Sequence, residues 1–148
     1  MGLLGGLFGD ETERVGLFVD GPNVLRSEFD VDLDDLRAIS TGEGTLAITR
    51  LYLDEHATPE LIQAAEARGF DVVTTSGDVD VRLAVDATAA AVEGTIDVLV
   101  VASRDADFKP VVERAAEEGL RTVALAPGSY GRSDALRNAA QHAVTMDE

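Results

Sequence analysis

The chain has no cysteine and no tryptophan, and its single lysine is Lys109. Without cysteine it can form no disulfide, no thiolate metal site and no cysteine nucleophile. This composition is compatible with the reducing cytoplasm, where we expect the protein to be located. Its two histidines, His56 and His142, have no ligand partners at zinc-site spacing. No apolar run approaches the ~20 residues that span a membrane, so we expect no membrane association.

Basic residues are scarce, with 12 Lys and Arg against 28 Asp and Glu and a net charge of −16. An acidic surface poor in lysine is typical of proteins in concentrated salt, where screening shortens self-repulsion to ~3 Å at 1 M. We therefore predict a halophilic source, and an ordinary acidic protein is the alternative. The charge also argues against tight, non-specific nucleic-acid binding. Any such contact would be local, through bound cations and a few arginines.

The first 13 residues differ from the rest in being apolar and rich in glycine, with no basic residue before Arg14. A secretory signal begins with positive charge, so this pattern does not match one. We expect residues 1–13 to be a flexible tail and 14–148 to be one domain, since 148 residues suffice for one core. The tail could also bind the body, a second copy or another protein through its apolar side chains, Leu3, Leu4, Leu7 and Phe8.

Apolar runs rich in Val, Ile and Leu alternate with segments of helical length. Most of these runs lack a polar alternation, which is typical of strands covered on both faces. We expect strands at Val15–Asp20, Thr45–Leu53, Phe70–Thr75, Ile96–Ala102 and Arg121–Ala126, and a short one at Ala143–Met146. We expect helices at 32–40, 59–68, 78–92, 108–118 and 133–141. This order predicts a single three-layer, Rossmann-like α/β domain, with a mostly parallel sheet of about five strands flanked by helices.

Aspartates occur where such a sheet would bring them together. Asp20 closes the first strand, Asp105 and Asp107 follow the fourth, and Asp80 and Asp86 lie in the helix between them. Ligands bind beyond the carboxyl ends of parallel strands, at the point where the strand order reverses. Carboxylate oxygens suit hard divalent cations, so the pattern predicts Mg²⁺ or Mn²⁺. Such an ion can activate water and stabilise the leaving oxygen of a phosphodiester.

Each acid also has a simpler interpretation. Asp20, Asp105 or Asp107 could cap a helix, although one cap needs only one acid and Ser103 could orient another. Asp86 could pair with Arg82 at i, i+4, a contact worth ~0.2–0.5 kcal/mol. Six residues along a helix are a rotation of ~600°, so residues 80 and 86 do not share a face. They converge only if residue 80 lies at or before the helix start.

Three motifs of the chain are Phe-Val-Asp-Gly-Pro-Asn at 18–23, Val-Asp-Val at 79–81 with Asp86, and Ser-Arg-Asp-Ala-Asp-Phe at 103–108. Together they resemble the NYN-domain family of the PIN-like ribonuclease superfamily, and the resemblance runs from about residue 14 to 143. The resemblance implies a five-stranded parallel sheet and a metal-dependent nuclease site, usually for RNA. It also implies that Asn23 orients a ligand or phosphate and that Asp86 is a further acidic site position. The residues that it implies as metal ligands, or as organisers of metal-bound water, are Asp20, Asp80, Asp105 and Asp107.

The chain departs from the family pattern at three positions. Arg104 replaces a glycine and Ala106 a serine, and Asp78 stands where the family tends to carry a lysine. Arg104 would either narrow the crevice or bind a phosphate through two hydrogen bonds. Asp78 removes a cation that would bind substrate.

We therefore predict a metal-dependent phosphodiesterase, an endoribonuclease that cleaves RNA with metal-activated water. The predicted substrate-binding residues are Asn23, Ser103, Arg104, Lys109 and Arg132. Asn23 is also predicted to be catalytic, with the four aspartates named as ligands. The alternative is a catalytically weak RNA-binding or regulatory module on the same fold. An aspartyl phosphatase is disfavoured because Pro22 occupies the position of its second acid. A glycine-rich dinucleotide site is also disfavoured, because no Gly-x-Gly-x-x-Gly follows the first strand.

Overall fold

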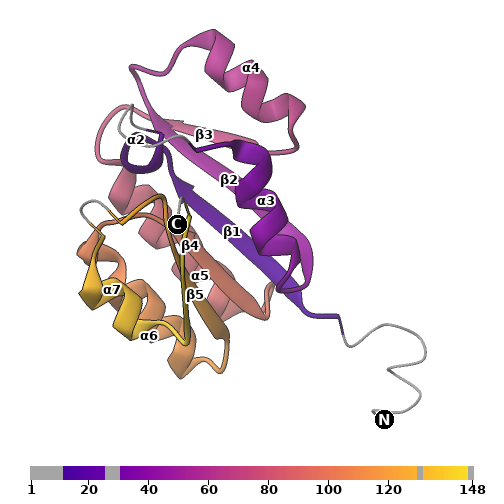
Figure 1. The fold of residues 1–148 in the computed structure, drawn as a ribbon, viewed down its shortest axis with the longest axis vertical. Coiled ribbons are helices and arrows are strands. Elements are labelled where there is room, and N and C mark those ends of the chain that lie inside the picture. Colours follow the sequence, from indigo (N-terminus) through magenta and orange to yellow (C-terminus); the bar gives the residue numbers. More distant parts are fainter. Residues whose placement is uncertain (1–11, 26–30, 130–131, 147–148) are drawn as a thin grey trace.

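Six parallel strands form the centre of the protein in the computed structural model, which describes residues 12–25, 31–129 and 132–146 (Figure 1). Their order across the sheet is β3-β2-β1-β4-β5-β6. The strands are β1 (Arg14–Asp20), β2 (Thr45–Asp54), β3 (Asp71–Thr75), β4 (Val98–Ala102), β5 (Arg121–Ala126) and β6 (His142–Thr145). The predicted α/β fold is confirmed, and the short terminal strand joins β5 as a sixth parallel member.

Helices cover both faces of this sheet and produce the predicted three layers. They are α2 (Gly21–Val24), α3 (Leu33–Thr41), α4 (Pro59–Ala67), α5 (Val79–Glu93), α6 (Lys109–Glu117) and α7 (Asp134–Ala139), with a 3-10 turn η1 (Ala106–Phe108) before α6. Side chains of α3 and α4 pack in one core, and those of α5, α6 and α7 pack in the other. Leu17 of β1 lies in the first core and Phe18 in the second, as the two-residue period of a strand requires.

Capping residues define the helix starts that the sequence predicted. The Thr58 hydroxyl accepts a hydrogen bond from the Leu61 N–H at 3.2 Å, with Pro59 in the first turn of α4. Asp78 caps α5 in the same way through the Asp80 N–H, at 3.1 Å. These side chains satisfy N–H groups that the first helical turn leaves unpaired. The cap at residue 78 therefore determines where residue 80 lies.

Strands β1 and β4 are adjacent, and the sheet order reverses between them. Their register pairs Val15 with Val98 and Val19 with Ala102, so Asp20 and Ser103 come next on neighbouring strands. Every residue of β4 is buried, and so is all of β1 after Arg14. Two rigid, fully covered strands thus present the residues that follow them at one edge of the sheet.

The predicted tail lies mostly outside the described residues, which begin at Thr12. The proposed division at residue 13 therefore stays a prediction. Among the helices of the described part, none combines the length and the apolar character that crossing a membrane would require.

Candidate metal centre

Asp20 lies at the carboxyl end of β1 and is almost fully buried, with 3% of its surface exposed. The Ser103 hydroxyl, which follows β4, donates a hydrogen bond to Asp20 Oδ2 at 3.0 Å. After Asp20 the chain turns at once into α2. A Cβ on Gly21 would lie 2.4 Å from the Tyr52 carbonyl oxygen, so only glycine allows this close turn against β2.

The loop after β4 is joined to α2 by short polar contacts. Ser103 Oγ accepts a hydrogen bond from the Asp105 N–H at 3.0 Å, and Asn23 Oδ1 accepts one from the Arg104 N–H at 2.8 Å. The Asp105 carboxylate in turn accepts from the Asp107 N–H at 2.9 Å and so caps η1. The predicted orienting role of Ser103 is thus seen on Asp20 and on the backbone of Asp105.

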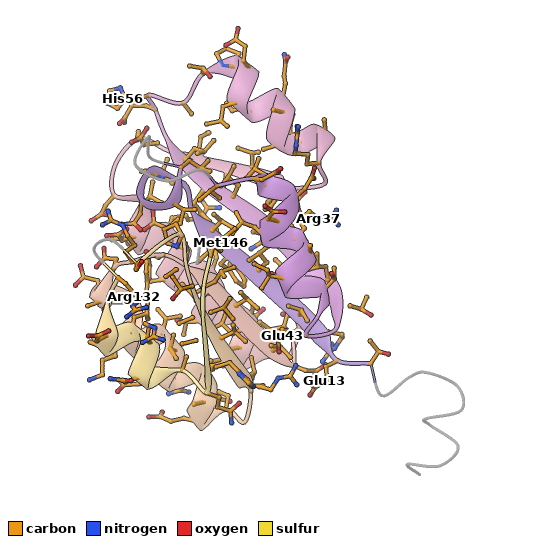
Figure 2. All side chains as sticks on the ribbon, viewed as in Figure 1. Glu13, Arg37, Glu43, His56, Arg132 and Met146 are labelled. Carbon is orange, nitrogen blue, oxygen red and sulfur yellow. The ribbon has the colours of Figure 1, made fainter. Side chains whose placement is uncertain are left out.

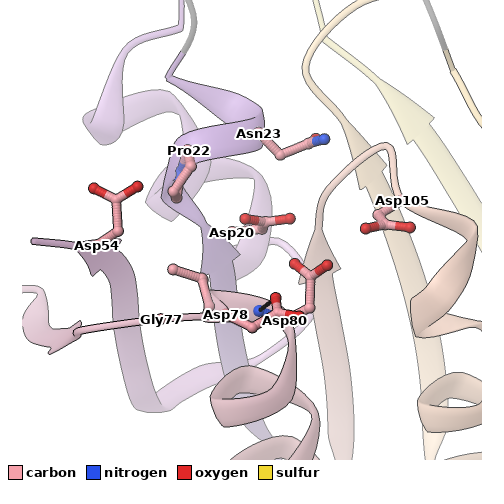
Figure 3. Close-up of a pocket in the computed structure, with 9 residues that line it drawn as sticks. Asp20, Pro22, Asn23, Asp54, Gly77, Asp78, Asp80 and Asp105 are labelled. Atoms are coloured by element: carbon pink, nitrogen blue, oxygen red, sulfur yellow. Dashed lines mark hydrogen bonds between the residues drawn. The ribbon is translucent and has the colours of Figure 1, made fainter. Parts of the chain in front are cut away.

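Asp80 reaches the same place from the opposite direction, in the first turn of α5. One carboxylate oxygen from each of Asp20, Asp80 and Asp105 lies within 4.8 Å of the other two. Figure 3 shows the three side chains at the carboxyl ends of the strands and at the start of α5. We call these three residues the acid cluster. Three sequence segments therefore supply the acid cluster. Residue 80 lies at the start of its helix, which is the position that the sequence pattern required for it to converge with other acids.

The acid cluster carries unfavourable negative charge. Burial raises the pKa of Asp20 from its usual 3.8 to about 6, although the Ser103 hydrogen bond partly offsets this. The pKa of Asp80 is raised to about 7 by burial, by hydrogen bonding with Asp105 and by the charge of Asp20. A divalent cation would relieve this repulsion, and an all-carboxylate donor set fits a hard cation such as Mg²⁺ or Mn²⁺. The cluster is therefore consistent with a divalent metal site.

A cavity of about 310 Å³ opens over the acid cluster. Among the described residues that line it, none is basic, and two acids that we did not predict as site residues, Asp54 and Asp78, join the cluster there (Figure 3). Asp54 ends β2 as Asp20 ends β1, so the rule that selected Asp20 could have found it. Asp78 was expected at the start of its helix, as a possible cap, and at a position where the family tends to carry lysine, but not as a site residue. The cavity is therefore lined by as many aspartates as predicted, but Asp54 and Asp78 take the places expected for Asp86 and Asp107.

Asp86 does not belong to the acid cluster. Its Oδ2 accepts hydrogen bonds from the Tyr52 hydroxyl at 2.8 Å and from Arg82 Nε at 3.1 Å, and Arg50 lies 3.8 Å away. The i, i+4 pair with Arg82 that we weighed as an alternative is therefore present. The rotation between residues 80 and 86 directs the two carboxylates to different places.

Asp107 is also outside the acid cluster, because it lies on η1 and lines a groove between α5 and α6. The predicted cationic contacts, Arg104, Lys109 and Arg132, do not line the acidic cavity either, whereas Asn23 does. Lys109 is exposed and lies 3.9 Å from Glu113, and Arg132 donates to Thr145 at 3.4 Å. The structure thus unites Asp20, Asp80, Asp105, Asn23 and Ser103. Arg104 lies close enough to Asp20 for their charges to interact, whereas Lys109 and Arg132 do not line the cavity.

The parallel sheet and the carboxylates beyond its strand ends define an α/β domain with an acidic site at the switch in strand order. Comparison with known proteins identifies it further: residues 14–147 match the NYN domain, and the chain belongs to that family. The family predicted from the three motifs is thereby confirmed.

The chain is also similar to one further sequence and to one solved structure. The uncharacterized protein MJ0482 of Methanocaldococcus jannaschii is 39% identical over 135 residues, which are 91% of this chain and 56% of that protein. This chain therefore spans little more than half of its relative. A protein of unknown function from Vibrio parahaemolyticus, VPA0982, has the same fold, with a TM-score of 0.81 and 22% identity. That match covers 94% of this chain and 96% of the other.

Proposed function

We propose that the protein is a metal-dependent phosphodiesterase, and specifically an endoribonuclease. The observation that carries the proposal is the convergence of Asp20, Asp80 and Asp105 within 4.8 Å at the switch in strand order. Three carboxylates held this close are electrostatically costly, and burial together with neighbouring carboxylates raises the pKa values of Asp20 and Asp80. Membership of the NYN family adds support for RNA as the substrate.

In this proposal Asp20, Asp80 and Asp105 hold one or two Mg²⁺ or Mn²⁺ ions. The bound ion supplies the positive charge that activates water for attack at phosphorus and stabilises the leaving oxygen. Ser103 keeps Asp20 in a fixed rotamer through its 3.0 Å hydrogen bond. Asn23 is bonded to the Arg104 N–H and keeps α2 against the loop, so that both sides of the cavity keep their positions.

Substrate contacts must lie at the rim of the cavity, because none of its described lining residues is basic. Arg104 adjoins Asp105 directly, and we propose it as the first contact with a phosphate. Lys109 and Arg132 are candidates for contacts further along an RNA strand. The phosphate group itself would be attracted by the bound ion, whose charge would offset part of the negative charge of the site.

The test is cleavage of labelled single-stranded RNA in concentrated KCl with Mn²⁺, Mg²⁺ or a chelator. Asp20→Asn and Asp105→Asn should each abolish turnover, because each removes a ligand charge while keeping the side-chain volume. Asp71→Asn is the matched control, since this exposed aspartate opens β3 at the amino end of the sheet. Undiminished cleavage by the two cluster variants would refute the proposal.

The second candidate is an RNA-binding or regulatory module without efficient cleavage. The observation that favours it is the absence of basic residues from the described cavity lining, together with Asp78 at a position where the family tends to carry lysine. It predicts RNA binding that persists in chelator and no metal-dependent cleavage of any RNA tested. Failure to bind RNA at every salt concentration would exclude this candidate.

A further inference from the structure

An apolar groove of about 720 Å³ runs between α5 and α6, on the face of α5 that points away from the sheet. Its apolar lining consists of Ala84, Val85, Ala89, Val92, Pro110 and Val111. Three valines of α5 are among the most exposed large apolar side chains of the described chain: Val81 is 60% exposed, Val85 59% and Val92 48%. Asp107 and Arg114 also line the groove, but its α5 side carries no charged residue. In a protein of net charge −16, exposed valines on such a face are typical of an interaction surface.

The N-terminal end of the described chain lies beside one end of this groove. Glu13, Arg14 and Val92 line a common neighbouring cavity, and Val92 also lines the groove. Hydrogen bonds hold Arg14 there. Its backbone N–H and its Nε donate to Asp97 Oδ2 at 2.8 Å and 3.2 Å, and its Nη2 donates to the carbonyl oxygen of Gly94, just after α5, at 2.9 Å. Glu13 pairs with Arg121, which also bonds Glu43; Figure 2 labels both glutamates near the start of β1.

An apolar, uncharged segment precedes Glu13 in the sequence. Residues 1–9 carry no charged side chain and contain Leu3, Leu4, Leu7 and Phe8. Phe8 is five residues before Glu13 and can therefore reach about 17 Å, and Leu3 can reach about 35 Å. Helix α5 has 15 residues and is about 22 Å long. The segment is thus long enough to follow the groove from Val92 towards Val81.

We propose that the apolar segment Leu3–Phe8 docks in the α5/α6 groove of its own chain. Its leucines and phenylalanine would cover the exposed valines, which removes apolar surface from water on both partners. The short connection through Glu13 favours this intramolecular contact over one with another copy, because it gives the segment a high effective concentration. The groove walls, α5 and η1–α6, start next to Asp80 and Asp105, so the docked segment would also brace the two elements that carry these acids.

A tryptophan introduced into the segment tests this directly, because the chain has none. Phe8→Trp should show emission at short wavelength and protection from acrylamide at all protein concentrations. Adding Val85→Glu should shift the emission to longer wavelength and remove the protection. Ala67→Glu is the matched control: it is an exposed position on α4, across the sheet, and should leave the emission unaltered.

Solvent-exposed emission in Phe8→Trp itself would overturn the proposal. A shift that depends on protein concentration would also overturn it, because it would assign the groove to a second copy. A full-length variant with Leu7→Ser and Phe8→Ser provides an independent measurement. It should bind more of an apolar dye than the parent protein, and Val85→Glu should abolish the excess; equal dye binding by the variant and the parent would contradict docking.

Discussion

Ser103 is the residue on which the arrangement of the acid cluster most directly depends. Its hydroxyl donates to the Asp20 carboxylate and accepts from the Asp105 N–H, both at 3.0 Å. One buried hydroxyl therefore orients a carboxylate on β1 and the backbone of the loop after β4. Groups that orient metal ligands in this way typically change metal affinity 10–100-fold when they are removed.

We expect Ser103→Ala to weaken Mn²⁺ binding by about 10–100-fold and to reduce the free energy of unfolding by about 1–2 kcal/mol. Isothermal titration calorimetry and urea unfolding measure the two effects. Ser40→Ala is the control, because that buried hydroxyl bonds the Leu36 carbonyl oxygen far from the cluster. It should lower stability without altering Mn²⁺ affinity; equal Mn²⁺ affinity in both variants would show that Ser103 has no orienting role.

The raised pKa values of Asp20 and Asp80 also make stability dependent on pH. An acid whose pKa is higher in the folded state binds its proton more tightly there than in the unfolded chain. Without metal, its contribution to stability is therefore present below pH 4 and is lost as the pH rises through about 6 for Asp20 and about 7 for Asp80. Metal binding has the opposite dependence, since it requires the ionised carboxylates.

We predict that Asp20→Asn stabilises the metal-free protein relative to the parent at pH 8 but not at pH 4. For Asp20 alone the difference between the two pH values is on the order of 3 kcal/mol, because each pKa unit corresponds to about 1.4 kcal/mol. Thermal and urea unfolding in chelator would measure it, with Asp71→Asn as the exposed control. If the difference in the free energy of unfolding between Asp20→Asn and the parent did not depend on pH, the pKa of Asp20 would not be raised in the folded protein.

At the scale of elements, the sequence predicts most of what positions the site. Buried parallel strands appear as apolar runs and helix starts as capping residues, so the end of β1, the start of α5 and the loop after β4 could all be located in advance. The sequence left open where Asp80 lies relative to the helix start, and in the structure the Asp78 cap places it in the first turn of α5. Side-chain direction within α5 was harder, because Asp86 finds its partner on β2, in Tyr52, which no local pattern connects to it.

Asp54 and Asp107 illustrate the same difficulty. Asp54 was overlooked because a single acid after a strand is usually unremarkable, and only the sheet order places β2 beside β1 and brings Asp54 to the cavity. Asp107 looked equivalent to Asp105, but the tight η1 turn separates them. Asp105 enters the cluster, while Asp107 lines the groove between α5 and α6. Tertiary geometry, rather than local spacing, makes these distinctions.

Asp86→Asn tests whether this residue is a ligand or a structural contact. It weakens the hydrogen bond from Tyr52 that joins α5 to β2 and the pair with Arg82 within α5, so we expect a loss of about 1–3 kcal/mol of stability. Because Asp86 lies outside the acid cluster, Mn²⁺ affinity should change much less than in Asp80→Asn. Calorimetry measures the Mn²⁺ affinity of both variants. An equal loss of Mn²⁺ affinity in Asp86→Asn and Asp80→Asn would indicate that Asp86 is a metal ligand.

The charge of the whole molecule sets the terms on which RNA could bind. With a net charge of −16, the long-range potential repels a polyanion, and only the bound ion and the rim cations attract it. A basic protein that makes 6–10 phosphate contacts loses about 10³–10⁵ in affinity between 50 and 200 mM salt, because counterions are no longer released favourably. Here the same change screens the repulsion that opposes binding. Added salt therefore weakens the phosphate contacts and also weakens the repulsion, and these effects act in opposite directions on the dependence of RNA binding on salt concentration.

We therefore predict a shallow salt dependence of kcat/KM for RNA cleavage at saturating Mn²⁺. If Arg104, Lys109 and Arg132 each contact one phosphate of a single strand, the logarithmic slope against KCl is about −2 or flatter, since each contact contributes about −0.7. Alanine at each of these three positions should flatten it further by about that amount. Arg68→Ala, an exposed position on the α4 side, is the matched control. A slope steeper than about −4 would require phosphate contacts beyond these three cations, and the RNA path would then have to cross another surface of the protein.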